Sequence, residues 1–204
     1  MDEYMNAIGH NFVNGACTIC GEKDSSYKPP VKSEFSDVKS GAYYYDAVQW
    51  AVANEITNGM GNGIFAPDTT CTRGQIVTFL YRAAGKPDVS ASVSFKDVKS
   101  DAYYYKAVQW AVANGITNGV GGDMFAPDAT CTRAQVVTFL YRANNSPAVG
   151  AANSFNDVPV GAYYANAVVW AIEEGITKGT GNGCFSPDMG CTRAQVVTFL
   201  YRAQ

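Results

Sequence analysis

Three arginines occupy equivalent positions in a sequence that repeats every 60 residues. Each stands in a Thr-Arg-x-Gln segment that predicts a helix start, because the threonine hydroxyl and the glutamine side chain can form a capping box. Exposed backbone amides at a helix N-terminus favour an anion, and a guanidinium adds a fork suited to a carboxylate. The segments predict up to three carboxylate sites, with Arg73, Arg133 and Arg193 as their cations.

Other residues of the repeat could complete a sugar-binding site. A glycine loop would let the backbone approach a sugar ring closely, and a tryptophan or the Tyr43-Tyr44 pair could stack on it. The tryptophans also fit an apolar helix stripe, which favours a core role, and the aspartate of Phe-x-Asp-Val could cap a helix instead of touching ligand. The candidate ligand contacts are Gly59, Gly119, Gly179, Trp50, Trp110, Trp170, Asp37, Asp97, Asp157, Gln75, Gln135 and Gln195.

The spacing of apolar residues predicts the elements that carry these side chains. Tyr44, Ala47, Val48 and Ala51 follow the i, i+3, i+4, i+7 pattern of an amphipathic helix over about 43–54. A glycine loop and a short extended run follow, and then a second helix from Thr72. Each unit is therefore expected to be helix, loop, helix.

The ends of the first helices differ between copies. Gly115 and Gly175 are typical helix stops, whereas the first copy has Glu55 there. We expect Glu55 either to be strained in a left-handed conformation or to adopt another cap. Its charge further predicts weaker anion binding in the groove that uses the first copy's loop.

One unit is too small to bury both helices, so the copies must pack on one another. The sequence predicts a mainly all-α fold with pseudo-threefold packing, and an open solenoid as the alternative. The expected segments are 1–34 as an N-terminal linker and 35–94, 95–154 and 155–204 as three repeats forming one cooperative domain. We expect a monomer in which the three repeats form a pseudo-trimer.

Composition excludes several classes of function. The 204 residues carry a formal charge of -3 and a pI near 5.1, which argues against nucleic acid or an anionic membrane surface as partner. No apolar run approaches the roughly 18 residues needed to span a bilayer. The one histidine lies outside the repeats, so no catalytic triad can be assembled within them and no enzyme is expected.

We expect the chain to be the C-terminal part of a larger protein, with a fused cargo domain upstream.

The six cysteines fall into three groups. Cys71, Cys131 and Cys191 precede the capping boxes, and buried thiols are favoured there over metal binding. Cys184 occupies a hydrophobic slot, with a disulfide to Cys191 as the alternative. His10, Cys17 and Cys20 form H-x6-C-x2-C, half of a zinc motif. Zinc with an outside ligand, a disulfide, and a remnant of a neighbouring module all remain open, and no other cofactor is expected.

The ordered set Phe-x-Asp-Val, aromatic pair, Ala-Val, Gly-Ile-x-x-Gly, Phe-x-Pro and Thr-Arg resembles the S-layer homology family over residues 35–204. The resemblance implies a three-unit bundle that attaches bacterial surface proteins non-covalently to secondary cell-wall polysaccharide, commonly through a pyruvylated sugar, in grooves between units. It places the protein at the extracellular bacterial surface. Glutamine replaces the family's final acid at Gln75 and its copies, which makes the grooves less negative. The alternative is a module for protein contacts or lattice assembly without a glycan site.

Overall fold

The computed structural model describes residues 12–13, 16–17, 20–23, 35–90, 92–150 and 153–204. Helices dominate these residues, which confirms the mainly α prediction, and none is long and apolar enough to cross a bilayer. A small antiparallel hairpin precedes them, formed by β1 (Phe12–Val13) and β2 (Ala16–Cys17). The helices are α1 (Tyr45–Ala53), α2 (Arg73–Ala83), α3 (Tyr105–Ala113), α4 (Arg133–Ala143), α5 (Ala165–Glu173) and α6 (Arg193–Arg202).

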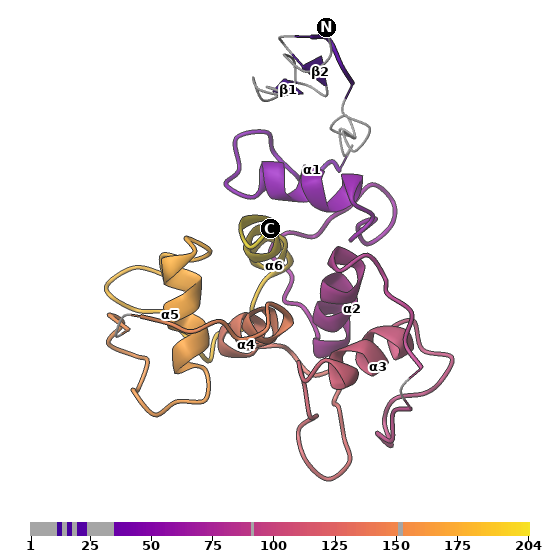
Figure 1. The fold of residues 1–204 in the computed structure, drawn as a ribbon, viewed down its shortest axis with the longest axis vertical. Coiled ribbons are helices and arrows are strands. Elements are labelled where there is room, and N and C mark those ends of the chain that lie inside the picture. Colours follow the sequence, from indigo (N-terminus) through magenta and orange to yellow (C-terminus); the bar gives the residue numbers. More distant parts are fainter. Residues whose placement is uncertain (1–11, 14–15, 18–19, 24–34, 91, 151–152) are drawn as a thin grey trace, which may run out of the picture.

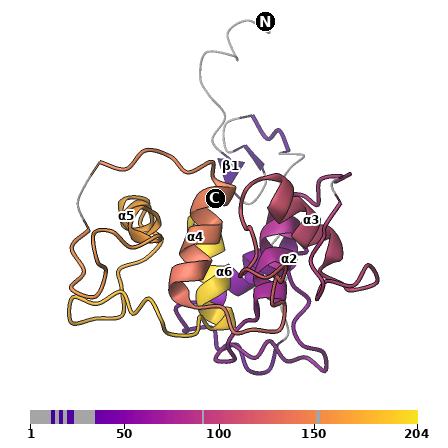
Figure 2. The same cartoon turned by 90° about the horizontal axis from the view of Figure 1, so that it is seen from below.

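The second helices of the three repeats form the centre of the domain. Helices α2, α4 and α6 contact one another, while α3 packs on α2, α5 on α4 and α1 on α6 (Figures 1 and 2). Each outer helix therefore packs on the central helix of the preceding repeat. Because α1 belongs to the first repeat and α6 to the third, the arrangement is closed, and the open solenoid alternative is wrong.

Three cysteines close the ring through their backbones. The amide of Cys71 donates to the carbonyl of Cys191 over 2.9 Å, Cys131 donates to Cys71 over 2.9 Å, and Cys191 donates to Cys131 over 3.0 Å. Each hydrogen bond joins two repeats, and the cycle returns to its start. This pattern fixes the pseudo-threefold relation of the repeats just before the central helices begin.

The capping boxes form in all three copies, as predicted. Thr72 Oγ1 accepts from the Gln75 amide over 3.3 Å, and Gln75 Oε1 accepts from the Thr72 amide over 3.1 Å. The same reciprocal pairs occur in α4 and α6. The glutamine side chains are thereby engaged by the fold, because each satisfies an amide that no helical carbonyl reaches.

The outer helices end in a left-handed residue in every repeat. Gly115 and Gly175 have φ of 66° and 68°, as expected of helix stops, and Glu55 has φ of 57°. Of the two alternatives for Glu55, the strained one holds, at a cost of about 1 kcal/mol. Its carboxylate forms an ion pair with Lys86 Nζ at 2.8 Å, so the charge difference between copies is partly neutralised.

Candidate functional site

The arginines of the Thr-Arg-x-Gln segments lie in the protein interior. Arg73, Arg133 and Arg193 expose only 2–3% of their surface. The Arg133 guanidinium lies over the rings of Phe185 and Phe199, at 4.9 and 5.3 Å from their centroids, and its Nε donates to the Phe185 carbonyl over 2.9 Å. The side chain therefore serves packing between repeats, and its role as a fork for a ligand carboxylate stays a prediction.

A buried peptide connects each arginine to an aspartate. Asp157 accepts hydrogen bonds from the amides of Phe185 and Ser186 at 2.8 and 2.7 Å, while the carbonyl of the same Phe185 accepts from Arg133. Burial alone would raise the pKa of Asp157, but these amide hydrogen bonds lower it below its usual value. The helix-capping alternative for this residue is wrong, because its carboxylate binds a loop 28 residues further along the chain.

The same connection recurs around the ring. Asp97 binds the amides of Phe125 and Ala126, and Phe125 accepts from Arg73. Asp37 binds the amides of Phe65 and Ala66, and Phe65 accepts from Arg193 across 128 residues of sequence. In every case the arginine belongs to one repeat and the loop to the next, so these connections help to close the ring.

The glycine loop positions also serve internal packing. Gly59 has φ of 80°, and a Cβ there would lie 2.5 Å from both the Ile64 carbonyl oxygen and the Phe35 ring. Gly119 and Gly179 meet the equivalent atoms of their own repeats. The absent side chain is therefore explained by contacts within the loop, and a ligand role for these glycines stays a prediction.

The tryptophans pack in the core, while neighbouring tyrosines are exposed. Trp110 and Trp170 expose 7% and 5% of their surface and contact Tyr81 and Tyr141 of the preceding repeats, which favours the core alternative over a sugar platform. Trp50 contacts Tyr201 in the same way. By contrast, 64% of Tyr103 is exposed, and its ring packs edge-on against Tyr104. Tyr43 and Tyr163 repeat this arrangement, so the tyrosines are the aromatic surface available to a ligand.

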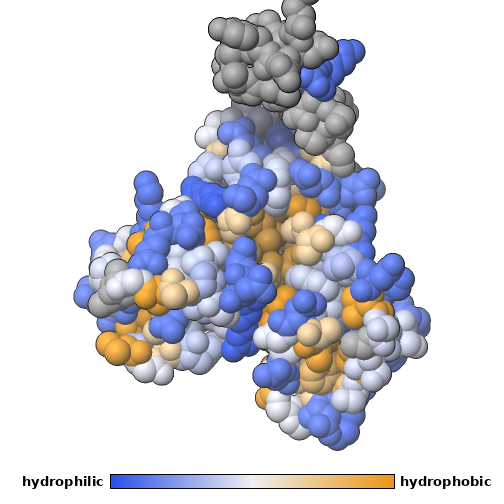
Figure 3. All heavy atoms as spheres, viewed as in Figure 1, coloured by the Kyte–Doolittle hydropathy of each residue, from blue (hydrophilic) through white to orange (hydrophobic). Residues whose placement is uncertain are grey.

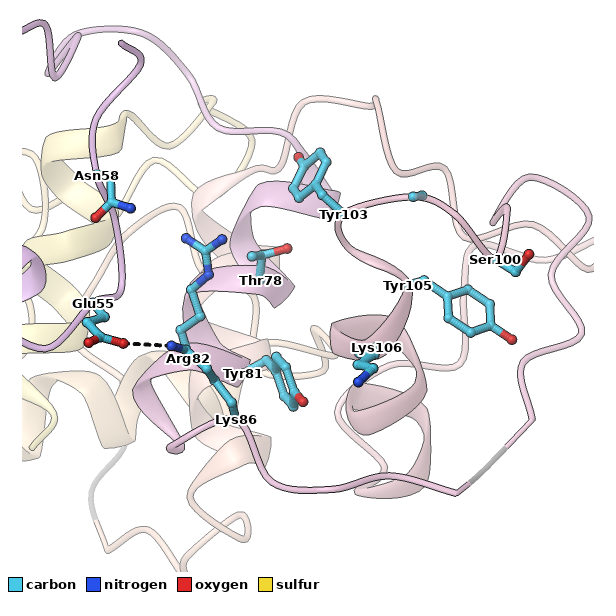
Figure 4. A pocket seen from close by; sticks show the side chains of 11 residues that line it. Glu55, Asn58, Thr78, Tyr81, Arg82, Lys86, Ser100, Tyr103, Tyr105 and Lys106 are labelled. Carbon is cyan, nitrogen blue, oxygen red and sulfur yellow. Dashed lines mark hydrogen bonds and ion pairs between the residues drawn. The ribbon is translucent and has the colours of Figure 1, made fainter.

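A groove of about 660 Å³ lies between the first and second repeats. In the close-up of Figure 4, Glu55, Arg82 and Lys86 line one side and Tyr103, Tyr105 and Lys106 the other. The space-filling view shows hollows between the lobes of the molecule, with hydrophobic atoms toward the centre (Figure 3). We call this the 1/2 groove, and it is lined by Glu55, Asn58, Thr78, Tyr81, Arg82, Lys86, Ser100, Ala102, Tyr103, Tyr105 and Lys106.

Two cations of the 1/2 groove, both lysines, were missed by reasoning from the repeat. Lys86 and Lys106 correspond, 60 residues later, to Ser146 and Asn166. The repeat pattern consists of residues that the copies share, and it therefore does not include these lysines. The signal that could have found them is the opposite one: positive charges that occur at a repeat position in one copy only.

Burial suppresses ionisation of the three cysteines whose backbones close the ring, Cys71, Cys131 and Cys191. Desolvation raises the pKa of Cys71 and Cys131 from 9.0 to about 12, and it raises the pKa of Cys191 as well. All three side chains are fully buried thiols, and the disulfide alternative between Cys184 and Cys191 is wrong in this structure. No group of three metal-binding side chains occurs among the residues that the structure describes.

These thiols predict a loss of stability in alkali. Unfolded thiols release their protons above pH 9 while the folded thiols keep theirs, so the stabilisation is complete below pH 9 and is lost as pH rises to 12. We expect the free energy of unfolding to fall by up to about 1.4 kcal/mol per pH unit for each thiol. Urea unfolding across this range should show a steeper fall than in the triple variant C71V/C131V/C191V. Parallel curves for the two proteins would contradict the prediction.

The closed ring of three helical pairs, with a groove between the first and second repeats, defines a module built from repeats. The S-layer homology domain family matches residues 34–77, 94–137 and 154–197. The chain belongs to this family, and the three matches coincide with the three repeats of the ring. This confirms the family expected from the sequence motifs.

The curated relatives are proteins of the bacterial surface and enzymes. The chain is 32% identical over 168 residues, or 80% of its length, to a surface-layer 125 kDa protein of Lysinibacillus sphaericus, and 29% identical over 70% of its length to a cellulosome-anchoring protein of Acetivibrio thermocellus. It is also 27% identical over 82% of its length to an amylopullulanase of Thermoanaerobacterium thermosulfurigenes. The chain covers 14%, 33% and 9% of these proteins, respectively. The similarity therefore concerns a shared module within larger proteins.

Proposed function

We propose that this module anchors a bacterial surface protein to the cell wall, without a covalent bond, by binding secondary cell-wall polysaccharide in its inter-repeat grooves. The proposal includes a location at the extracellular cell surface and a binding role without catalysis. Membership of the S-layer homology family supports anchoring, as do the surface-layer and cellulosome-anchoring relatives. The observation that carries the ligand assignment is the 1/2 groove, where an exposed tyrosine faces a cluster of cations.

The charges of this groove favour an anionic sugar. Arg82 and Lys86 lie on one side and Lys106 on the other, against the single carboxylate of Glu55. Glu55 is already paired with Lys86, and no salt bridge in the described part of the chain involves Lys106. A carboxylate entering the groove would therefore meet a net positive field. A pyruvyl ketal on a sugar ring supplies such a carboxylate next to a face that Tyr103 can cover.

The grooves differ in charge in a way that reverses the order expected from Glu55 alone. Where the second and third repeats meet, the positions of Glu55, Lys86 and Lys106 are taken by Gly115, Ser146 and Asn166. Where the third and first repeats meet, Asp46 replaces Lys106. The 1/2 groove is accordingly the one we propose for the anionic sugar.

The test is co-sedimentation of the purified chain with isolated cell-wall polysaccharide, before and after removal of its pyruvyl groups. Removal of the groups should weaken binding of the unmodified chain. Lys106→Gln and Tyr103→Ala should each reduce affinity for the intact polysaccharide by about 10-fold, because each removes one ligand contact. Lys96→Gln is the matched control, since Lys96 is an exposed lysine that pairs with Asp123 away from the groove.

Two results would reject the proposal at different levels. Equal binding to pyruvylated and depyruvylated polysaccharide would reject the carboxylate as the recognised group. Equal binding by Lys106→Gln, Tyr103→Ala and Lys96→Gln would reject the 1/2 groove. Failure to bind any wall polysaccharide, together with self-association in solution, would favour the alternative of a lattice-assembly module.

A further inference from the structure

The N-terminal hairpin brings two cysteines into one tight turn. Cys17 ends β2, where it pairs with Phe12 of β1. The Gly21 amide donates to the Cys17 carbonyl over 2.9 Å, and the Cys17 amide donates to the Glu22 carbonyl over 2.8 Å. Gly21 has φ of 76°, a conformation that lets the chain reverse directly after Cys20. These hydrogen bonds hold Cys17 next to the residues that directly follow Cys20, at the end of the hairpin.

The described part of this hairpin is small. Each strand has two residues, and an isolated two-stranded hairpin is marginal in water even when longer. Units of fewer than about 40 residues usually depend on a disulfide, a metal or a partner. Cys17 is nevertheless 3% exposed and Cys20 is exposed, and both are thiols. A ligand held by the two sulfur atoms would stabilise this turn further.

We propose that Cys17 and Cys20 are two thiolate ligands of a zinc ion that stabilises the N-terminal hairpin. Two cysteines separated by two residues, with a glycine directly after the second, suit a tetrahedral metal with a preference for sulfur. On binding, each thiol loses its proton and each sulfur donates to the metal, with no change of oxidation state. His10, the third residue of the sequence motif, lies outside the described residues, and its contribution is tested separately.

The experiment titrates the reduced full chain with Zn²⁺ and, for its absorption spectrum, with Co²⁺. We expect one saturable site with sulfur-to-cobalt charge-transfer bands, displaced by zinc. Cys17→Ser and Cys20→Ser should each weaken zinc binding by at least about 100-fold, since loss of even an outer-shell partner costs 10- to 100-fold. His10→Gln measures whether histidine is a third ligand. One zinc per two chains would assign the remaining positions to a second copy and would keep both cysteines as ligands.

Cys184→Ser is the matched control, because Cys184 is a partly exposed thiol in the third repeat. This variant should bind zinc as tightly as the unmodified chain. The proposal is overturned if the Cys17→Ser and Cys20→Ser variants retain full affinity. It is also overturned if alkylation and mass analysis of the native protein, prepared without reductant, show these two cysteines joined in a disulfide. The repeat domain's helical circular dichroism should be unchanged in every variant, which separates loss of the metal from loss of the fold.

Discussion

Arg133→Glu is expected to destabilise the repeat domain severely. The substitution places a carboxylate where a buried guanidinium now lies against two phenylalanine rings and donates to the Phe185 carbonyl. An unpaired buried carboxylate facing a carbonyl oxygen costs several kcal/mol, to which the loss of the aromatic and hydrogen-bond contacts is added. We expect a loss of at least about 4 kcal/mol, a large part of the roughly 5–15 kcal/mol by which a typical domain is stable. Urea unfolding followed by circular dichroism measures this loss in the free energy of unfolding.

Arg142→Glu is the matched control for this charge reversal. Arg142 lies on the same helix, α4, but near its C-terminal end, where it is partly exposed and donates to the Ile116 carbonyl of its own repeat over 3.0 Å. We expect a loss of about 1 kcal/mol and a folded protein. If Arg133→Glu folded as stably as Arg142→Glu, the arginine would not hold the repeats together. Charge reversal at Arg133 is consequently unsuitable as a test of ligand binding alone.

Gly119→Ala is expected to destabilise the second repeat nearly as strongly. A Cβ at this position would lie 2.5 Å from the Met124 carbonyl oxygen and 2.6 Å from the Phe95 ring, both inside van der Waals contact. The residue also has φ of 83°, which an L side chain adopts only with strain. Because the carbonyl belongs to the loop backbone and the ring packs against Phe125, neither can move freely. We expect a loss of about 3 kcal/mol in urea unfolding.

Gly121→Ala separates the two causes of that loss. Gly121 lies in the same loop with φ of 96°, but a Cβ there would meet no atom within 4 Å. This variant has the backbone strain without the clash and should lose about 1 kcal/mol. Equal losses at the two positions would show that backbone conformation alone explains the glycine. A markedly larger loss at Gly119 would support close packing inside the loop.

The local structure of this chain could be predicted because neighbouring residues decide it. The threonine and glutamine of each capping box are three positions apart, so the pair that starts the helix is visible in the sequence. Helix stops at Gly115 and Gly175 depend on one residue and its φ. The repeat period gave the number of units, and the apolar stripes showed that the units must pack together.

The roles of Arg133 and Asp157 could not be predicted in the same way. Both are anchored to one peptide, that of Phe185, but they lie 52 and 28 residues from it. A helix start with an arginine favours an anion site when the first turn faces solvent, and a buried interface when another repeat covers it. The sequence alone contains no information on which of these occurs. The motif by itself therefore predicts a ligand site at the arginine.

The 1/2 groove likewise could not be predicted from the repeat pattern. Its cations come from the first repeat at Lys86 and the second at Lys106, and it exists only where those repeats face each other. The sequence by itself determined the family, the helices with their starts and stops, and the need for the copies to pack. Only the tertiary structure decided that the ring closes, that the arginines are buried and that the lysines meet, because each of these depends on contacts between residues that are distant along the chain.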